Sequence, residues 1–202
     1  MILLFILLLL ISFAAGWFDL PAVYVGIIYI IFICLFLYRA MYPFLFEKRV
    51  DKILQALNRA RNPQHQFLYY LFQDDLKKAE EQLQKIRSSQ AVVVLQFLLL
   101  SQQERFMEAR ELLPTLRKGK QKAYYSAAIA LEFDDYKLYE QNKQQIQDNL
   151  LLFFLEVEEL AKKGQVHAAI KKLDEIIPSL RGLRLLSAVQ EKKALKKKLY
   201  LQ

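Results

Sequence analysis

This sequence is poor in the residues that cross-link a chain or interrupt its helices. It has one cysteine, Cys34, with five glycines and five prolines among 202 residues. A single cysteine excludes an intrachain disulfide framework. Scarce glycine and proline argue against a β-sandwich, which needs many tight turns. His65 and His167 are the only histidines, too few for a metal site without help from carboxylates. These absences favour an all-α protein.

Charge is nearly missing from residues 1–42, where Asp19 and Arg39 are the only charged side chains and cancel. The whole net charge of +8 therefore falls in residues 43–202. Residues 1–18 and 22–38 form two apolar runs, each near the lower limit of about 17–20 residues that crosses a bilayer core. The pattern predicts a two-helix transmembrane anchor, a helical hairpin, over residues 1–42.

Positive side chains set the expected orientation of this anchor. Four of them follow the second run, and none lies between the runs: Arg39, Lys48, Arg49 and Lys52. We expect a multi-pass protein of a bacterial inner (cell) membrane with its C-terminal domain in the cytoplasm. The alternative is a cleaved signal peptide over residues 1–15, since residues 12–14 resemble a small-residue cleavage site. The second run would still anchor the chain.

Residues 43–62 predict an amphipathic juxtamembrane neck helix, which Pro43 either opens or separates from the span. Its apolar side chains fall at helical spacing: Phe46, Val50, Ile53, Leu54 and Leu57. Basic residues occupy the other positions. Such a helix suits anionic lipid head groups, or its apolar stripe packs under the first repeat. Phe46 also lies 30 residues before Leu76, so the helix is a candidate half-unit of the repeat described next.

A 30-residue step runs through residues 63–180. It relates large apolar residues at Leu76, Phe106, Tyr136 and Val166. Three residues later it relates Ala79, Ala109, Tyr139 and Ala169, and two residues earlier it relates Asp74, Glu104, Asp134 and Gly164. A fixed step of this size predicts an array of helical hairpins. Tyr139 and Lys143 break the pattern, so we expect the third unit, residues 122–147, to bend, loosen or admit a partner.

Each unit should pair an apolar first helix with a more charged second helix. The expected first helices are 63–72, 91–101, 122–133 and 149–163, and the second are 75–87, 105–117, 135–147 and 165–177. Short links make such helices antiparallel neighbours. The apolar runs 91–100 and 150–155 are too short to span a membrane and predict buried core helices.

The second helices resemble those of tetratricopeptide repeats. The motif is carried by Gly164, Ala169, Leu173 and Ile176, and echoed by Ala79, Leu83 and Ile86 and by Ala109, Leu113 and Leu116. In that family the small residue lets two helices approach closely. The resemblance implies an α-solenoid that binds a protein or peptide. The first helices depart from the family pattern, with only Tyr70 where the family has tyrosine, and the step is 30 residues instead of 34.

Residues 181–202 predict a basic C-terminal capping helix that covers the last open face of the array. Its lysines are candidates for binding anionic lipid or an acidic partner: Lys192, Lys193, Lys196, Lys197 and Lys198. Nucleic acid is disfavoured, because Tyr200 is the only aromatic residue among these lysines and base stacking needs more. A merely solvated face is the alternative.

A polar stripe along the first helices is the candidate partner-binding surface. Glutamines recur at seven-residue spacing in phase with the repeat, with tyrosines beside them. The candidate residues are Gln66, Tyr69, Tyr70, Gln73, Gln96, Gln103, Tyr125 and Glu156. In a solenoid groove they could satisfy the backbone of an extended peptide. The alternative is that these positions only face water.

No catalytic or cofactor-binding motif is recognisable in the sequence, so we expect no enzyme and no cofactor. The leading hypothesis is a membrane-anchored cytoplasmic adaptor or scaffold. One alternative is a structural subunit whose apolar first helices are buried in a larger membrane complex. The other is a basic-surface binder of anionic lipid.

Overall fold

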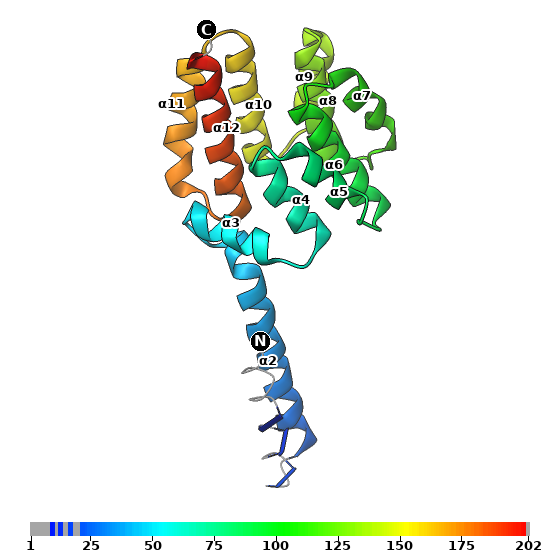
Figure 1. Cartoon of the computed structure of the whole chain (residues 1–202), viewed down its shortest axis with the longest axis vertical. Coiled ribbons are helices and arrows are strands. Elements are labelled where there is room, and N and C mark those ends of the chain that lie inside the picture. Colours follow the sequence, from blue (N-terminus) through cyan, green and yellow to red (C-terminus); the bar gives the residue numbers. More distant parts are fainter. Residues whose placement is uncertain (1–8, 11, 14–15, 18–20, 201–202) are drawn as a thin grey trace.

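The computed structural model describes residues 9–10, 12–13, 16–17 and 21–200, and every regular element in this part of the chain is a helix (Figure 1). The expected all-α class is confirmed. Most of the first predicted membrane run lies outside the described residues, as does Ala14 of the proposed cleavage site. The elements are α2 (Ala22–Leu45), α3 (Val50–Arg59), α4 (Pro63–Phe72), α5 (Leu76–Leu83), α6 (Ser89–Gln102), α7 (Phe106–Leu112), η1 (Leu113–Thr115), α8 (Lys120–Glu132), α9 (Tyr136–Lys143), α10 (Asn149–Lys162), α11 (Val166–Ile176), η2 (Ile177–Ser179) and α12 (Gly182–Tyr200).

Helix α2 projects from the helical domain (Figure 1), and the hydroxyl groups of Ser12 and Tyr29 lie 2.5 Å apart between the described part of the first run and α2. Within the described residues it is the one helix long and apolar enough to span a membrane, with a mean hydropathy of 2.2 over Val23–Leu45 and none of it buried. It runs through Pro43, where the sequence pattern predicts a boundary. Proline removes one backbone donor, but Phe46 N still donates to Tyr42 O at 2.8 Å and closes the last turn.

The predicted neck over residues 43–62 is shorter than expected and belongs to the domain. Its helix, α3, begins at Val50, and Phe46 ends α2 instead of opening a half-unit. Ile53 and Leu57 of α3 are fully buried, in one cluster with side chains of α10, α11 and α12. The apolar stripe therefore packs against the helical domain, because it finds an apolar face there to cover it.

The 30-residue step coincides with the geometry of the helix pairs. Its apolar residues are the first residues of α5, α7, α9 and α11. The residues two places earlier all have left-handed backbone, with φ between 56° and 75°: Asp74, Glu104, Asp134 and Gly164. A residue in this conformation reverses the chain after each first helix. The second helices are shorter than expected: α5, α7 and α9 end at Leu83, Leu112 and Lys143, and α7 and α11 each continue into a 3₁₀ turn that contains a proline.

The core is divided into successive clusters that follow the chain. Each of the first three joins one helix pair to the first helix of the next: α4, α5 and α6; then α6, α7 and α8; then α8, α9 and α10. The runs at 91–100 and 150–155 supply buried residues such as Phe97, Leu99 and Leu155, in agreement with their assignment as core helices. Each helix pair is thus stabilised by its neighbours.

The third helix pair is as closely packed as the others. Tyr139 is fully buried where the other second helices have alanine, and it belongs to the same core cluster as the fully buried Ala127 of α8. The 30-residue step gives phenylalanine or valine at the position of Ala127, namely Phe67, Phe97 and Val157. A large residue on one helix is therefore matched by a small one on its partner. The expectation of a loosened third unit is wrong for this core position.

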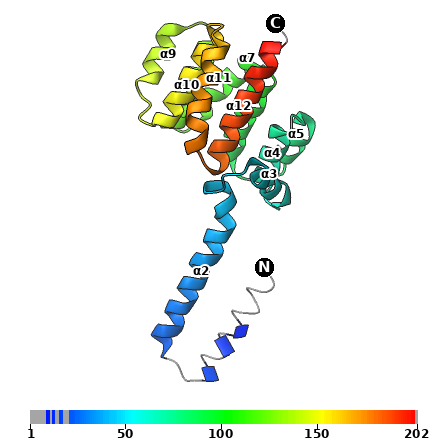
Figure 2. The same cartoon turned by 90° about the vertical axis from the view of Figure 1, so that its left-hand side faces the viewer.

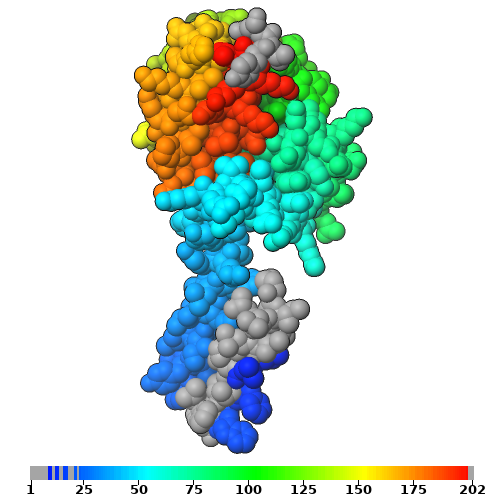
Figure 3. Space-filling model, turned by 60° about the vertical axis from the view of Figure 1, so that its left-hand side comes forward, coloured from blue at the N-terminus to red at the C-terminus, as the bar shows by residue number. Residues whose placement is uncertain are grey.

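The two ends of the domain meet beside the root of α2. Gly182 N, at the start of α12, donates to Glu47 O at 2.8 Å. Gly182 has φ 55°, and a Cβ there would lie 2.0 Å from Phe44 O, so only glycine fits. Phe44 stacks on His65 of α4 at a centroid distance of 4.4 Å. Figure 2 shows α2 entering beside α3 and α12, and Figure 3 shows α12 lying between α11 and the cyan and teal segments that include α3.

Candidate functional site

The predicted polar stripe does not form one continuous lining. Gln66 Nε2 donates to Asn58 O at 2.9 Å and to Ala60 O at 2.8 Å, so its amide fastens the α3–α4 link. Tyr125 is 8 % exposed and its ring lies 4.3 Å from that of Phe97. Burial also raises the pKa of Tyr125 to about 12. Both side chains are occupied inside the domain and offer little surface to a partner.

Tyr69 and Tyr70 lie at the junction of two clusters. Half-buried Tyr69 packs against the cluster that joins α3 to the last helices. Tyr70 packs into the first pair, and the ammonium of Lys78 lies 5.5 Å from its ring centroid. The two rings meet edge to face at 5.3 Å. This arrangement stabilises the fold and exposes only part of each ring.

The remaining candidates of the stripe lie apart from one another. Gln73 and Gln103 are the C-terminal caps of α4 and α6, and Gln103 accepts a hydrogen bond from Arg105 Nη1 at 3.0 Å. Gln96 is half-buried on α6. Glu156 on α10 forms an ion pair with Lys172 of α11. Of the stripe, Gln73 is the most open to a partner.

The basic tail lies at the end of the domain far from α2. The chain end marked C in Figures 1 and 2 is on the side opposite the apolar rod. Lys192 forms an ion pair with Asp174 of α11. Lys193, Lys196, Lys197 and Lys198 are exposed.

A polar cluster that the sequence pattern did not predict joins α8, α10 and α12. Tyr124 Oη donates to Glu158 Oε1 at 2.8 Å. Burial, helped by the nearby Glu191 carboxylate, raises the pKa of Glu158 to about 8, although the Tyr124 hydrogen bond opposes that change. Burial raises the pKa of Glu191 as well, and Lys198 opposes it. The sequence shows three ordinary polar residues here, because only the packing of distant helices brings them together.

The next residue along α10 has the opposite environment. Glu159 Oε2 accepts from Tyr139 Oη at 2.9 Å, and its carboxylate pairs with Lys163 at 2.6 Å and Lys143 at 3.4 Å. The Lys163 hydrogen bond is the largest cause that lowers the pKa of Glu159. Tyr139 and Lys143, which break the sequence pattern, thus bind the same carboxylate on the following helix.

Exposed apolar side chains mark a second surface that the sequence pattern did not predict. Four large hydrophobic residues are exposed in the described part of the domain after Phe46: Met107, Phe133, Tyr136 and Leu138. They lie on α7, at the end of α8 and on α9. The guanidinium of Arg110 lies 5.4 Å from the Phe133 ring and links α7 to that turn. We call these four residues the α7–α9 apolar surface.

Comparison within the repeat could have revealed part of this surface. The 30-residue step places Met107 level with Lys77 and Lys137, and Phe133 level with Gln73 and Gln103. An apolar residue at a position that is polar in sister units is the signal. It applies only in part to Leu138, which is level with Ala168 as well as Lys78, and it does not apply to Tyr136.

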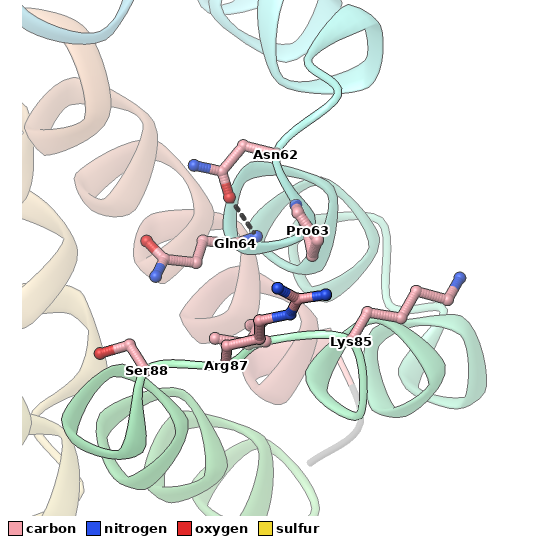
Figure 4. Close-up of a pocket in the computed structure, with 7 residues that line it drawn as sticks. Asn62, Pro63, Gln64, Lys85, Arg87 and Ser88 are labelled. Atoms are coloured by element: carbon pink, nitrogen blue, oxygen red, sulfur yellow. Dashed lines mark hydrogen bonds between the residues drawn. The ribbon is translucent and has the colours of Figure 1, made fainter.

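A shallow pocket of about 410 Å³ lies between the α3–α4 and α5–α6 links (Figure 4). Asn62, Pro63 and Gln64 form one side, and residues 85–88 form the other. Asn62 Oδ1 accepts from Gln64 N at 2.9 Å and caps α4. Lys85 and Arg87 are the charged residues of its lining.

No family model, curated protein or solved structure is significantly similar to this chain. The function is therefore inferred from the residues of the chain itself.

Proposed function

We propose that this protein is a membrane-anchored scaffold that binds a protein partner through the α7–α9 apolar surface. The observation that carries the proposal is the exposure of Met107, Phe133, Tyr136 and Leu138 on a domain whose other large apolar residues are at least partly covered. Exposed apolar side chains that cluster on a surface are typical of protein contacts. The proposed partner surface therefore differs from the polar stripe that the sequence predicts on the first helices, and most of it belongs to the second helices.

The proposed anchor is α2, preceded by a further span in residues 1–18. The apolar length of α2, in which Arg39 is the only charged residue, and the absence of buried residues from its apolar window support membrane insertion. Arg39 and the basic residues after α2, together with a preceding loop that has no basic residue, support a cytoplasmic domain at a bacterial inner membrane. A reporter fused after Gln202 tests this orientation: a cytoplasmic signal is expected, and an extracytoplasmic signal would overturn it.

The helix pairs are of a tetratricopeptide-like kind in this proposal. Support comes from the buried alanines Ala79, Ala109 and Ala169 at the positions where that family needs a small residue. The structural-subunit alternative was motivated by the apolar first helices. Side chains such as Phe97 and Leu155 are covered by neighbouring helices of the same chain, so a larger complex is not required to bury them.

The test replaces three apolar residues with the polar residues of sister units. Met107→Lys, Phe133→Gln and Leu138→Lys install the residues found at positions 77, 73 and 78, so each is compatible with its place in a helix pair. Full-length tagged protein is cross-linked in native membranes, and partners are quantified by mass spectrometry. We expect the main partner to fall by about tenfold or more, as loss of an interface centre predicts.

The matched control adds the same charge elsewhere. Gln165→Lys and Ala168→Lys add two positive charges at exposed positions at and near the start of α11. This variant should retain the partner. Equal recovery by wild type and the triple variant would remove the α7–α9 apolar surface from the proposal. Absence of any stoichiometric partner, with α2 still in the membrane, would overturn the scaffold function.

A further inference from the structure

The end of the helical domain beside the root of α2 is rich in basic residues. We call it the proximal end, and it includes the links at residues 46–49, 60–62, 84–88 and 180–181. These links contain six basic residues against Glu47: Lys48, Arg49, Arg61, Lys85, Arg87 and Arg181.

The fold gathers these basic links from distant parts of the sequence. The Gly182–Glu47 hydrogen bond joins the α11–α12 link to the α2–α3 link. The Phe44–His65 stack brings the first turn of α4 to the same place. The shared pocket sets the Lys85 and Arg87 side beside Asn62, and Figure 4 shows the labelled side chains around it. The links at 46–49, 60–62, 84–88 and 180–181 therefore surround the point where α2 enters.

Five of these six basic residues, all but Arg49, take part in no ion pair within the described structure. Four of the five are exposed: Lys48, Arg61, Lys85 and Arg87. The one acid in these links already has partners, because Glu47 Oε1 accepts hydrogen bonds from Lys48 N at 2.9 Å and Arg49 N at 3.1 Å, and Glu47 Oε2 lies 4.0 Å from Lys52 Nζ. These four residues, which we call the proximal cations, are available to an external anion.

We propose that the proximal cations hold the helical domain against anionic lipid head groups of the membrane that α2 enters. This inference rests on the proposed membrane anchor but not on the proposed protein partner. Each Lys or Arg near an anionic bilayer strengthens association about fivefold.

The same geometry excludes the basic tail from this role. Lys193 follows the start of α12 by 11 residues, which places it roughly 16 Å along the helix from the proximal end, and Lys198 is farther still. Salt screens charges beyond about 8 Å at physiological ionic strength. The tail lysines are therefore too distant to feel the bilayer that the proximal cations touch.

The experiment measures the distance of each domain end from the head groups. Full-length protein carrying Cys34→Ser is placed in nanodiscs with a constant small fraction of nitroxide-headgroup lipid. A fluorophore is attached at Gln84→Cys, in a proximal link, or at Gln102→Cys, at the other end of the α5–α6 unit; both positions are exposed. We expect quenching at position 84 to be about threefold greater in membranes with roughly 30% anionic lipid than in zwitterionic ones, given several charges of this strength. Position 102 should not respond.

Two variants separate the proximal cations from the tail. Changing Lys48, Arg61, Lys85 and Arg87 to Gln should abolish the response to anionic lipid. Changing Lys193, Lys196, Lys197 and Lys198 to Gln removes the same charge and should leave the response intact. High salt should also abolish it. The proposal is overturned if lipid charge has no effect at position 84, or if the tail variant loses the response and the proximal variant keeps it.

Two further measurements test the anchor and the identity of the anion separately. Resistance of the wild type and both variants to alkaline extraction from membranes reports insertion of α2, so a failed anchor is distinguished from a failed lipid contact. Heparin or RNA added to zwitterionic nanodiscs tests for a soluble polyanion. Binding of these polyanions through the proximal cations without any response to anionic lipid would overturn the lipid assignment.

Discussion

The second and third helix pairs solve one packing problem in opposite ways. The buried cluster of α6 and α7 includes Phe97 on the first helix and Ala109 on the second, whereas that of α8 and α9 includes Ala127 on the first helix and Tyr139 on the second. The large residue therefore lies on the first helix in one pair and on the second helix in the other, and the small residue lies on the opposite helix each time. Because protein interiors are packed at nearly crystalline density, a pair can keep its spacing only if both exchanges occur together. A break in a sequence repeat therefore need not mark a weak point.

The exchange also introduces a polar contact that the other pairs lack among the described residues. Tyr139 ends in a hydroxyl, which donates to Glu159 of α10 at 2.9 Å. Beside it, Glu158 accepts from Tyr124 of α8 at 2.8 Å. Glu158 and Glu159 thus each accept a hydrogen bond from a tyrosine of the third pair, but lysines surround only Glu159. The neighbouring carboxylates consequently have pKa values displaced in opposite directions.

The largest expected effect comes from removing the aromatic ring of the third pair. Tyr139→Ala leaves two alanines facing each other at a fully buried site. We expect the free energy of unfolding to fall by about 3–5 kcal/mol, the usual cost of truncating a buried aromatic residue. Unfolding of the detergent-solubilised full chain is followed by circular dichroism. Tyr136→Ala, at an exposed tyrosine of the same helix, is the control and should cost less than about 1 kcal/mol.

A compensating substitution tests whether the two pairs are interchangeable. Ala127→Phe alone overfills the site and should destabilise by about 1–3 kcal/mol. Combined with Tyr139→Ala it recreates the Phe97–Ala109 arrangement, so the double variant should be more stable than Tyr139→Ala by at least roughly 1.5 kcal/mol. If the losses of unfolding free energy in the two single variants simply added in the double variant, residues 127 and 139 would not compensate each other in volume.

The next largest effect concerns Glu158. Its pKa in the folded chain is about 8 against an ordinary value of 4.5, so between these values the folded state binds a proton that the unfolded state has released. The contribution of Glu158 to stability is fully present below about pH 4.5 and is lost as the pH rises through 8. Glu158→Gln cannot titrate, and at about pH 9 it should exceed wild type in free energy of unfolding by on the order of 2 kcal/mol.

At about pH 4 this advantage should vanish, because protonated Glu158 and glutamine are both neutral. Glu159→Gln is the matched control on the adjacent residue. Its pKa is lowered, so the wild-type residue stabilises the fold above its ordinary pKa and loses that contribution at lower pH. Glu159→Gln should therefore destabilise at neutral pH. An advantage of Glu158→Gln that does not depend on pH would contradict the proposed cause.

The smallest effects come from the turns that end the first helices. Glu104 and Gly164 occupy equivalent turns with φ of 57° and 75°, a region that disfavours most side chains. Glu104→Gly should stabilise by about 0.5–1 kcal/mol, and Gly164→Ala should destabilise by about 1 kcal/mol. Asp74→Gly, where aspartate tolerates this region better, should gain less. The three variants are compared with wild type by thermal unfolding in one buffer. Equal stability changes in all three would contradict this explanation of the turns.

Prediction from the sequence succeeded where the cause was local. The 30-residue step locates the chain reversals at Asp74, Glu104 and Asp134, because a turn depends on a few adjacent residues. It failed where the cause was a contact between distant segments. Tyr125 was interpreted as a groove residue and is core, because Phe97 lies against it. The sequence does not single out Glu158, because nothing in its neighbourhood along the chain reveals Tyr124 or Glu191.

The sequence by itself determined the helical class, the register of the helix pairs and the long apolar run of α2, since periodicity, turn residues and hydropathy are properties of short stretches. The tertiary structure alone decided that Tyr139 fits against Ala127. It alone placed α12 beside the root of α2, with the basic links at one end of the domain and the lysine tail at the other. These outcomes depend on how successive helix pairs stack along the domain, and small rotations at each pair accumulate in a way that no local pattern records.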